Sequence, residues 1–209
     1  MTSARRIADA RRRGAWCAAA LACAWMSDAA AADRIRIEID GVDGAIAENV
    51  RDYLTLSRYA QRDDLTDAQV RKLADRAVDE AADALRPFGY YAPVVSSRTS
   101  RDDLKWIVRL RIKPGEPVKM ESVQVRITGP GSGERELAAV AAASPLQTGS
   151  RLDHAEYEQL KAGLIRAAFG LGYLDARLTV RELLVDPAQR KASAQLELDT
   201  GGQYRFGEI

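Results

Sequence analysis

The sequence contains little cysteine and histidine. Its two cysteines, Cys17 and Cys23, lie near the amino terminus, and His154 is the only histidine among 209 residues. A chain that loses its first 32 residues therefore has no thiol, which excludes disulfides and thiolate chemistry. His154 has no cysteine or second histidine with which to build a zinc-type site, so we expect no metal, and we expect no cofactor. His154 follows Asp153 at an expected helix start, where we predict a solvated side chain.

Long apolar runs are also scarce. Arginines between Arg5 and Arg13 precede the one such run, residues 15–26, which is shorter than the roughly 20 residues of a spanning helix. Alanines then occupy positions 29–32. This order predicts a cleaved signal peptide, residues 1–32, and export. Two alternatives stay open. One is a lipoprotein at Cys23, although Leu21 lies one position too close for a good lipobox, and the other is an uncleaved membrane anchor.

Neither sign of charge is in excess. The chain has 31 Lys and Arg residues against 30 Asp and Glu residues. Removal of residues 1–32 takes away five arginines and two aspartates, which leaves 26 against 28. Because a nucleic-acid surface is strongly basic, we expect no nucleic-acid partner. Arginines such as Arg109 and Arg111 are interspersed with acids, which favours an ordinary solvated surface, with binding of acidic clients or lipid head groups as the alternative.

After the expected leader, the chain repeats one order of elements: strand, helix, helix, strand, strand. Isoleucines alternate with charged residues from Ile35 to Ile39, and residues 123–127 alternate in the same way. This period of two is typical of a half-buried strand. Each such strand precedes a short helix with apolar residues on one face, namely Ile46, Val50, Tyr53 and Leu54 in the first half, and Leu137, Val140 and Ala141 in the second.

A longer helix follows in each half, and the two have matching ends. Thr66 with Gln69 predicts a capping box, and Asp153 with Glu156 repeats it in acidic form. Each helix runs to a glycine suited to the left-handed position after a helix. These glycines are Gly89 and Gly172.

Two strands are expected after each glycine, at residues 90–99 and 105–113, then at 173–184 and 191–199. Leu174, Ala176, Leu178 and Val180 provide the alternation in the third of them. The predicted fold class is α+β, with two tandem units that each have a three-stranded sheet and two helices on one face (βααββ).

We assign residues 33–115 to the first unit and residues 116–200 to the second. Residues 115–118 of the first junction correspond to residues 201–204, 86 positions later. Residues 201–209 therefore predict the start of a third, truncated unit of a longer protein, because an opening strand needs a partner.

Residues that could carry catalysis have simpler explanations. The acidic positions Asp63–Asp64, Asp67 and Asp102–Asp103 fall in expected loops or caps, which favours turn chemistry over acid–base catalysis. Residues 129–133 are glycine-rich but lack the Gly-Lys-Ser/Thr ending of a phosphate loop, so we predict a turn. Trp106 lies in an alternating strand and is expected to pack in or beside the core. We expect no enzyme, with an enzyme of unrelated class as the alternative.

The run from Phe88 to Tyr91, the junction at residues 114–118 and the order of elements resemble POTRA repeats of outer-membrane protein assembly factors. They are most similar to the TamA family, the outer-membrane subunit of the translocation and assembly module. The resemblance covers residues 34–209 through short motifs. It implies periplasmic modules, usually three, ahead of an outer-membrane β-barrel that is absent from this sequence. The implied partners are a TamB-like protein anchored in the inner membrane and unfolded outer-membrane clients.

The physical function that suits such a unit is strand addition, in which an extended segment pairs with the backbone of a sheet edge. We predict a partner-binding edge in the first unit at Val94, Val95, Arg98 and Arg101. Charged residues can instead protect an edge, as Arg177 and Arg181 can in the second unit. Two other functions stay open, the POTRA region of a two-partner secretion transporter and a stand-alone periplasmic protein-binding module.

Overall fold

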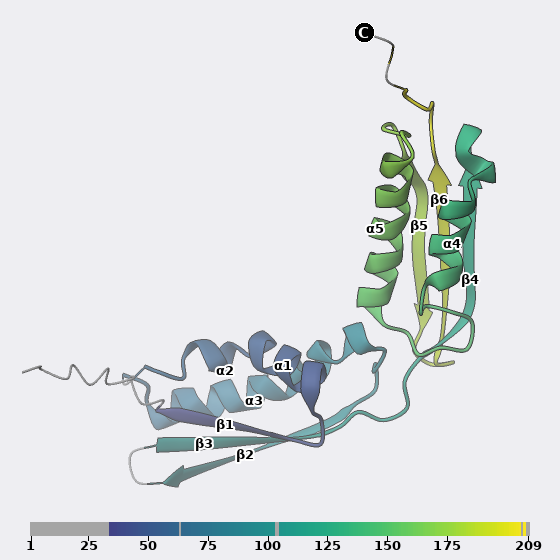
Figure 1. Cartoon of the computed structure of the whole chain (residues 1–209). Helices are drawn as coiled ribbons and strands as arrows, with labels where there is room; N and C mark the ends of the chain where they lie inside the picture. Colours follow the sequence, from purple (N-terminus) through teal and green to yellow (C-terminus); the bar gives the residue numbers. More distant parts are fainter. Residues whose placement is uncertain (1–33, 63, 103–104, 206, 208–209) are drawn as a thin grey trace, which may run out of the picture. The chain divides into compact units, whose positions relative to one another are not determined.

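The computed structural model describes residues 34–62, 64–102, 105–205 and 207 (Figure 1). The expected signal peptide, residues 1–32, lies outside the described residues. No helix within the described ranges is both long enough and apolar enough to cross a membrane. Two three-stranded sheets make up the fold, and helices cover one face of each.

The first sheet has the strand order β1-β3-β2, with the bounds β1 (Ile35–Asp40), β2 (Val94–Asp102) and β3 (Lys105–Lys113). The central strand β3 pairs parallel with β1 and antiparallel with β2. Its alternation is confirmed, because Val108, Leu110 and Ile112 are buried and the arginines between them are exposed. β1 and β2 are therefore the two edges of this sheet.

The helices on the first sheet are α1 (Gly44–Tyr53), α2 (Thr55–Arg58) and α3 (Asp67–Ala84), with a 3-10 turn, η1 (Arg86–Phe88), after α3. The capping box is confirmed, because Thr66 N donates to Gln69 Oε1 at 2.8 Å and Gln69 N donates to Thr66 Oγ1 at 3.4 Å. The short helix α2 was not predicted. It is held by Glu80, whose carboxylate accepts from Thr55 N at 2.7 Å and from Thr55 Oγ1 at 2.5 Å.

The second sheet repeats the topology in the order β4-β6-β5, with the bounds β4 (Lys119–Thr128), β5 (Arg177–Asp186) and β6 (Lys191–Asp199). Its helical elements are a 3-10 turn, η2 (Pro130–Gly133), and the helices α4 (Arg135–Ala143) and α5 (His154–Gly170). β4 is parallel to β6, and β5 is antiparallel to it. The predicted fold class is confirmed: the protein is α+β, with two tandem units that each have a three-stranded sheet and helices on one face.

Some expected details of the second unit are wrong. β5 begins at Arg177 rather than at residue 173, and Leu174 is 57% exposed. The pairing register shifts between Leu178 and Val180, so Val180 lies opposite Glu197 instead of facing the core. A bulge of this kind reverses the alternation of the residues beyond it. The period-two pattern from Leu174 to Val180 therefore does not describe one face of a strand.

Gly89 and Gly172 occupy equivalent loops, with φ of 84° and 89°. In each loop the glycine carbonyl accepts a hydrogen bond from the segment after the unit. Val118 N donates to Gly89 O at 2.8 Å, and Tyr204 N donates to Gly172 O at 2.8 Å. Val118 and Tyr204 are the residues that the 86-position offset relates. The unit boundaries and the start of a third unit at residues 201–209 stay predictions.

Candidate functional site at the free edge of the first sheet

The outer side of β2 has no paired strand among the residues that the structure describes. An unpaired edge presents backbone N–H and C=O groups that another extended chain can pair with. The four residues predicted for this edge all lie on β2 but on two different faces. Val94 and Arg98 lie on the helix-free face, whereas Val95 and Arg101 lie on the face toward the helices.

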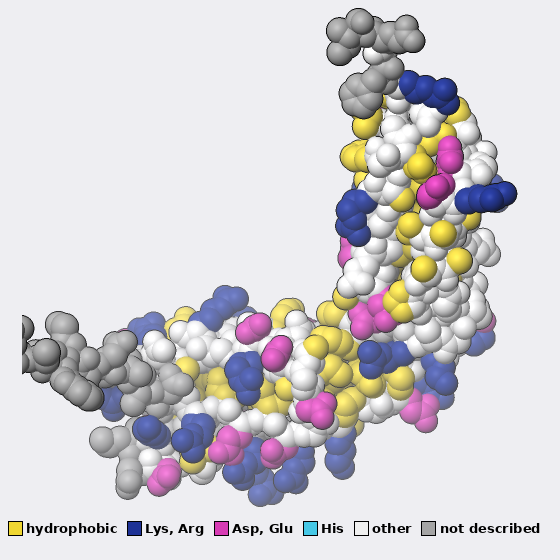
Figure 2. All heavy atoms as spheres, in the orientation of Figure 1, with side chains coloured by type: hydrophobic (Ala, Val, Ile, Leu, Met, Phe, Trp, Pro, Cys, Tyr) yellow, Lys and Arg dark blue, Asp and Glu magenta, His cyan; other side chains and the backbone are white. Residues whose placement is uncertain are grey.

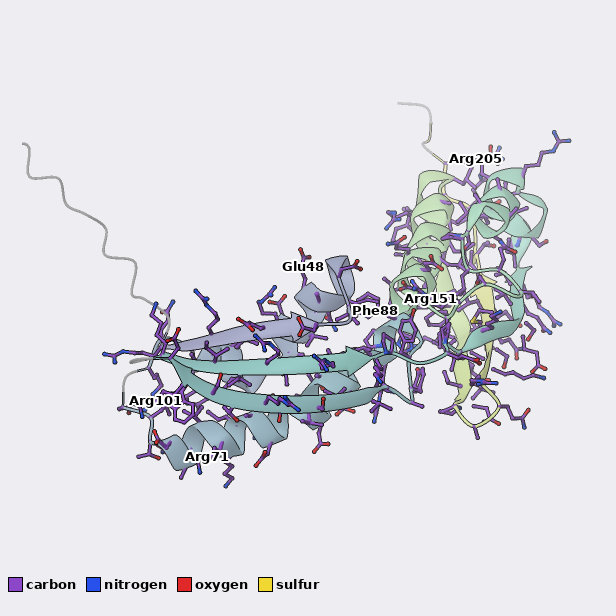
Figure 3. The ribbon with its side chains drawn as sticks, turned by 90° about the horizontal axis from the view of Figure 1, so that it is seen from below. Glu48, Arg71, Phe88, Arg101, Arg151 and Arg205 are labelled. Atoms are coloured by element: carbon purple, nitrogen blue, oxygen red, sulfur yellow. The ribbon has the colours of Figure 1, made fainter. Side chains whose placement is uncertain are left out.

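On the helix-facing side, Arg101 braces β2 against α3. Its Nη1 lies 3.3 Å from Asp67 Oδ1, and its guanidinium lies 5.6 Å from the centroid of the Trp106 ring. Trp106 is half-buried and packs against the core, as predicted. Arg101 therefore fixes the end of the strand near the β2–β3 hairpin, where Figure 3 labels it.

The opposite edge, β1, is shorter and partly covered. Arg34 N and Ile35 N both donate to Ala60 O, at 2.8 Å and 3.1 Å, so the loop after α2 occupies the start of this edge. A hollow of about 470 Å³ lies beside it, lined in part by Ile37 and Arg51. β2 has nine residues against six in β1, so β2 offers the longer free edge.

Basic side chains gather on the helix-free face of the first sheet. Figure 2 shows Lys and Arg along the lower side of this unit, and Figure 3 shows the strands from that side. The pairing register places on this face Arg36, Arg98, Lys105, Arg109, Arg111 and Lys113, together with the acids Glu38, Asp40 and Asp102. Ser96, Arg98, Arg109 and Arg111 line a hollow of about 120 Å³, which we call the arginine hollow.

Of the three arginines in the hollow, Arg109 alone forms ion pairs with described residues, although Asp40 lies opposite Arg111 in the β1–β3 register. Arg109 Nε and Nη2 both donate to Glu38 Oε2, at 2.8 Å and 2.5 Å, and Asp40 Oδ2 lies 3.9 Å from Arg109 Nε. Within the described part of the chain, neither Arg98 nor Arg111 forms an ion pair. Arg98 is directly opposite Arg109 across the β2–β3 pair. Like charges at directly opposite positions destabilise a sheet.

The edge of the second sheet is different. On β5, Arg177 Nη2 lies 3.1 Å from Asp199 Oδ2, so its charge is compensated. Arg181 is opposite the buried Leu196, on the helix-facing side of the sheet. The helix-free face near this edge carries Leu184, which is 64% exposed, and Glu182. The accumulation of positive charge is therefore specific to the first sheet.

The prediction of a solvated His154 is wrong. His154 is the first residue of α5 as expected, but it is half-buried, and its Nε2 lies 3.1 Å from Tyr91 Oη. Burial raises the pKa of the Tyr91 hydroxyl, and the charge of Arg86 opposes this shift. The sequence alone could not predict this contact, because Tyr91 and His154 are far apart along the chain.

Two of the acidic positions singled out in the sequence, Asp64 and Asp67, belong to ion pairs, whereas Asp102 ends β2 as an exposed residue. Asp64 accepts from Arg62 Nε at 2.8 Å, and this hydrogen bond holds the pKa of the Asp64 carboxyl below its usual value. Asp67 pairs with Arg101. Residues 63 and 103 lie outside the described part of the chain. Within that part, no three His, Cys, Asp or Glu side chains are grouped as metal ligands would be.

The glycine-rich segment after β4 is a turn, as predicted. Residues 130–133 form η2, and Gly131 N donates to Thr200 Oγ1 at 3.0 Å. An added Cβ at Gly131 would lie 2.8 Å from Thr200 Cγ2 and 2.9 Å from Tyr173 Cζ. Close packing explains the glycine at this position, and its amide group is already occupied.

Comparisons with known proteins found a family match to part of the chain and distant similarities to solved structures. Residues 36–114 match the family model described as POTRA domain TamA domain 1. At 15% identity, 82% of the chain aligns with 67% of BamA POTRA3-5 from Haemophilus influenzae, with a TM-score of 0.44. It also aligns over 82% of its length with 96% of POTRA1-2 of Omp85 from Anabaena, at 15% identity and a TM-score of 0.34. CdiB from Escherichia coli aligns over 83% of this chain and 27% of its own length, at 13% identity and a TM-score of 0.31.

Proposed function

We propose that this chain is the periplasmic POTRA region of an outer-membrane protein assembly or insertion factor of the TamA kind. It acts as a docking module and not as an enzyme. Its partners are an inner-membrane-anchored protein like TamB and unfolded outer-membrane clients. The family-model match over residues 36–114 supports the POTRA assignment, and the rest of the protein would supply the membrane part.

The observation that carries the docking role is the free edge of β2. It is a nine-residue strand that pairs on one side only among the described strands. Backbone pairing is largely independent of side chains, so such an edge suits a module that accepts many clients. Val94 is 66% exposed and lies at the start of this edge. The predicted residues Val94, Val95, Arg98 and Arg101 are all part of the proposed surface.

Photo-cross-linking in cells tests this proposal. The full chain, with its leader, is produced in a bacterium with two membranes and carries a benzophenone amino acid at Thr99 or Ser100 on β2. Asp75, which is exposed on α3, is the control position. We expect polypeptide adducts from the β2 positions and few from Asp75.

Hydrogen exchange on the isolated complex adds the decisive readout. A strand that pairs with β2 would slow exchange at alternate β2 amides, because only every second residue of an edge strand points its N–H outward. Adducts of equal yield from Asp75, or a complex with unchanged β2 exchange, would contradict the proposed docking mode.

A further inference from the structure

A strand that pairs with β2 must continue the pleat of the sheet. Side chains alternate between the two faces of a strand, and directly opposite residues share a face. Every second side chain of the added strand would therefore lie beside Ser96, Arg98 and Ser100 on the helix-free face. The other side chains would lie beside Val95 and Ser97, toward α3.

Charges across the helix-free face follow the order of the strands. Glu38 of β1 lies opposite Arg109 of β3 and Asp40 lies opposite Arg111, and both carboxylates form ion pairs with Arg109. Arg98 of β2 comes next, beside the free edge, and has no ion pair among the described residues. An acidic side chain on an added strand could form an ion pair with Arg98, as Glu38 does with Arg109. Acids are thus paired with arginine on the β1 side of this face, whereas Arg98 on the β2 side lacks an acidic partner within the described ranges.

We propose that the segment accepted by β2 is an extended acidic polypeptide with Asp or Glu at alternate positions, directed at the arginine hollow. This inference rests on the proposed docking at the β2 edge and names the chemistry of the partner. Arg98 binds the acidic side chain directly opposite it. Arg111 lies one strand further in, and its long side chain reaches toward the same carboxylates across the hollow.

The other alternate positions of the partner are small or apolar. On that side β2 presents Val95, which is half-buried against the core, and Ser97. Arg101 is already held by Asp67 and Trp106, so it does not compete for the acids of the partner. The expected partner pattern is acidic side chains on one face and small apolar side chains on the other.

The observations favour a polypeptide over an anionic membrane surface. The unpaired arginines lie in a small hollow next to backbone groups that only another peptide backbone satisfies as a ladder. Glu38 and Asp40 lie on the same face and would repel a wide layer of anionic head groups. A narrow extended segment along the β2 edge avoids these acids.

Binding of short capped peptides to the full chain tests the inference. The probes are a peptide that alternates valine and glutamate, its valine–lysine counterpart, and a block peptide with the glutamates grouped at one end. We expect the alternating acidic peptide to bind best and to weaken as salt is added, because exposed charges are screened. Arg98→Glu with Arg111→Glu should weaken it by about tenfold and strengthen the lysine peptide. Arg166→Glu, an exposed arginine on α5, is the matched control and should change neither.

Further measurements separate this inference from the proposed function. Equal binding of all three peptides, with slowed exchange at β2 amides, would overturn the acidic pattern and leave docking at the edge intact. Charge-dependent binding that survives N-methylation of the peptide backbone and leaves β2 exchange unchanged would overturn docking at the edge. Binding of phosphatidylglycerol vesicles through Arg98 and Arg111, without peptide binding, would assign the hollow to lipid and overturn the inference.

Discussion

Arg98 and Arg109 face each other directly across the antiparallel pair of β2 and β3, with both guanidinium groups on the helix-free face. Such a like-charge pair is unfavourable for the isolated fold. Glu38 relieves Arg109 but not Arg98. The charge of Arg98 therefore does not serve the stability of the unit itself.

The first prediction concerns this pair. Arg98→Thr removes the repulsion and introduces a β-branched residue, so the free energy of unfolding should rise by roughly 0.2–1 kcal/mol. Urea denaturation of the purified chain measures it. Arg126→Thr on β4 is the control, because Arg126 lies opposite Glu197, and its removal should leave stability unchanged or lower it. A destabilised Arg98→Thr variant would contradict the repulsion.

The second prediction concerns the glycine loops. Gly89→Ala should cost about 1–3 kcal/mol, because φ is 84° and the added Cβ would lie 2.5 Å from Leu152 O. Gly172→Ala should cost a similar amount, because its Cβ would meet Tyr204 O at 2.7 Å. Gly202→Ala is the control, since nothing lies within 4 Å of its added Cβ. Thermal unfolding of the three variants decides the matter, and three equal melting temperatures would count against the packing of these loops.

The third prediction concerns Glu80. Its side chain is only 12% exposed, accepts two hydrogen bonds from Thr55 and pairs with Arg76 Nε at 2.7 Å. Glu80→Ala should lower the free energy of unfolding by about 1–3 kcal/mol, because Thr55 loses the acceptor for its backbone N–H. Asp79→Ala, at an exposed neighbouring position, should change it by less than about 0.5 kcal/mol. Equal losses in both variants, measured by urea denaturation, would show that the Glu80 contacts do not hold α2.

The fourth prediction concerns pH. Burial, with a further contribution from the charge of Asp153, raises the pKa of Glu156 above 4.5, although Arg151 opposes the shift. The folded state then binds its proton more tightly than the unfolded state, so this contribution to stability falls as pH rises from the unfolded pKa through the folded one. Glu156→Gln removes the titrating carboxyl, so this loss of stability with rising pH should disappear. Urea midpoints between about pH 4 and pH 7 should decline less in the variant than in the unchanged protein. Parallel curves would refute the assignment to Glu156.

Much of the fold can be predicted from sequence because its strongest signals are local. The bounds of β3 and β6 agree with the expected ranges, since each alternates over its whole length. β2 starts four residues later than expected, after Pro93, which has no N–H to contribute to a ladder. The acidic cap at Asp153 also differs, because its side chain accepts from Ala155 N at 2.9 Å and the reciprocal box forms only at Thr66.

The candidate site was predicted only in part. The edge position of β2 agrees with the expected order of elements, so Val94, Val95, Arg98 and Arg101 could be named in advance. The arginine hollow could not be named, because Arg98 and Arg111 belong to different strands and only the pairing register shows that they share a face. The contact between Tyr91 and His154 could not be predicted for the same reason, because only the folded structure brings the two residues together.

The parallel pairing of β1 with β3 has a consequence for the order of folding. Ile35 pairs with Trp106, about 70 residues later in the chain, so β1 has no partner until almost the whole unit has been synthesised. The hairpin of β2 and β3, with α3 beside it, is assembled from closer residues. We therefore expect β1 to join last and its alternating isoleucines to stay exposed until β3 is in place. A chaperone that acts on the nascent first unit would have to shield this strand.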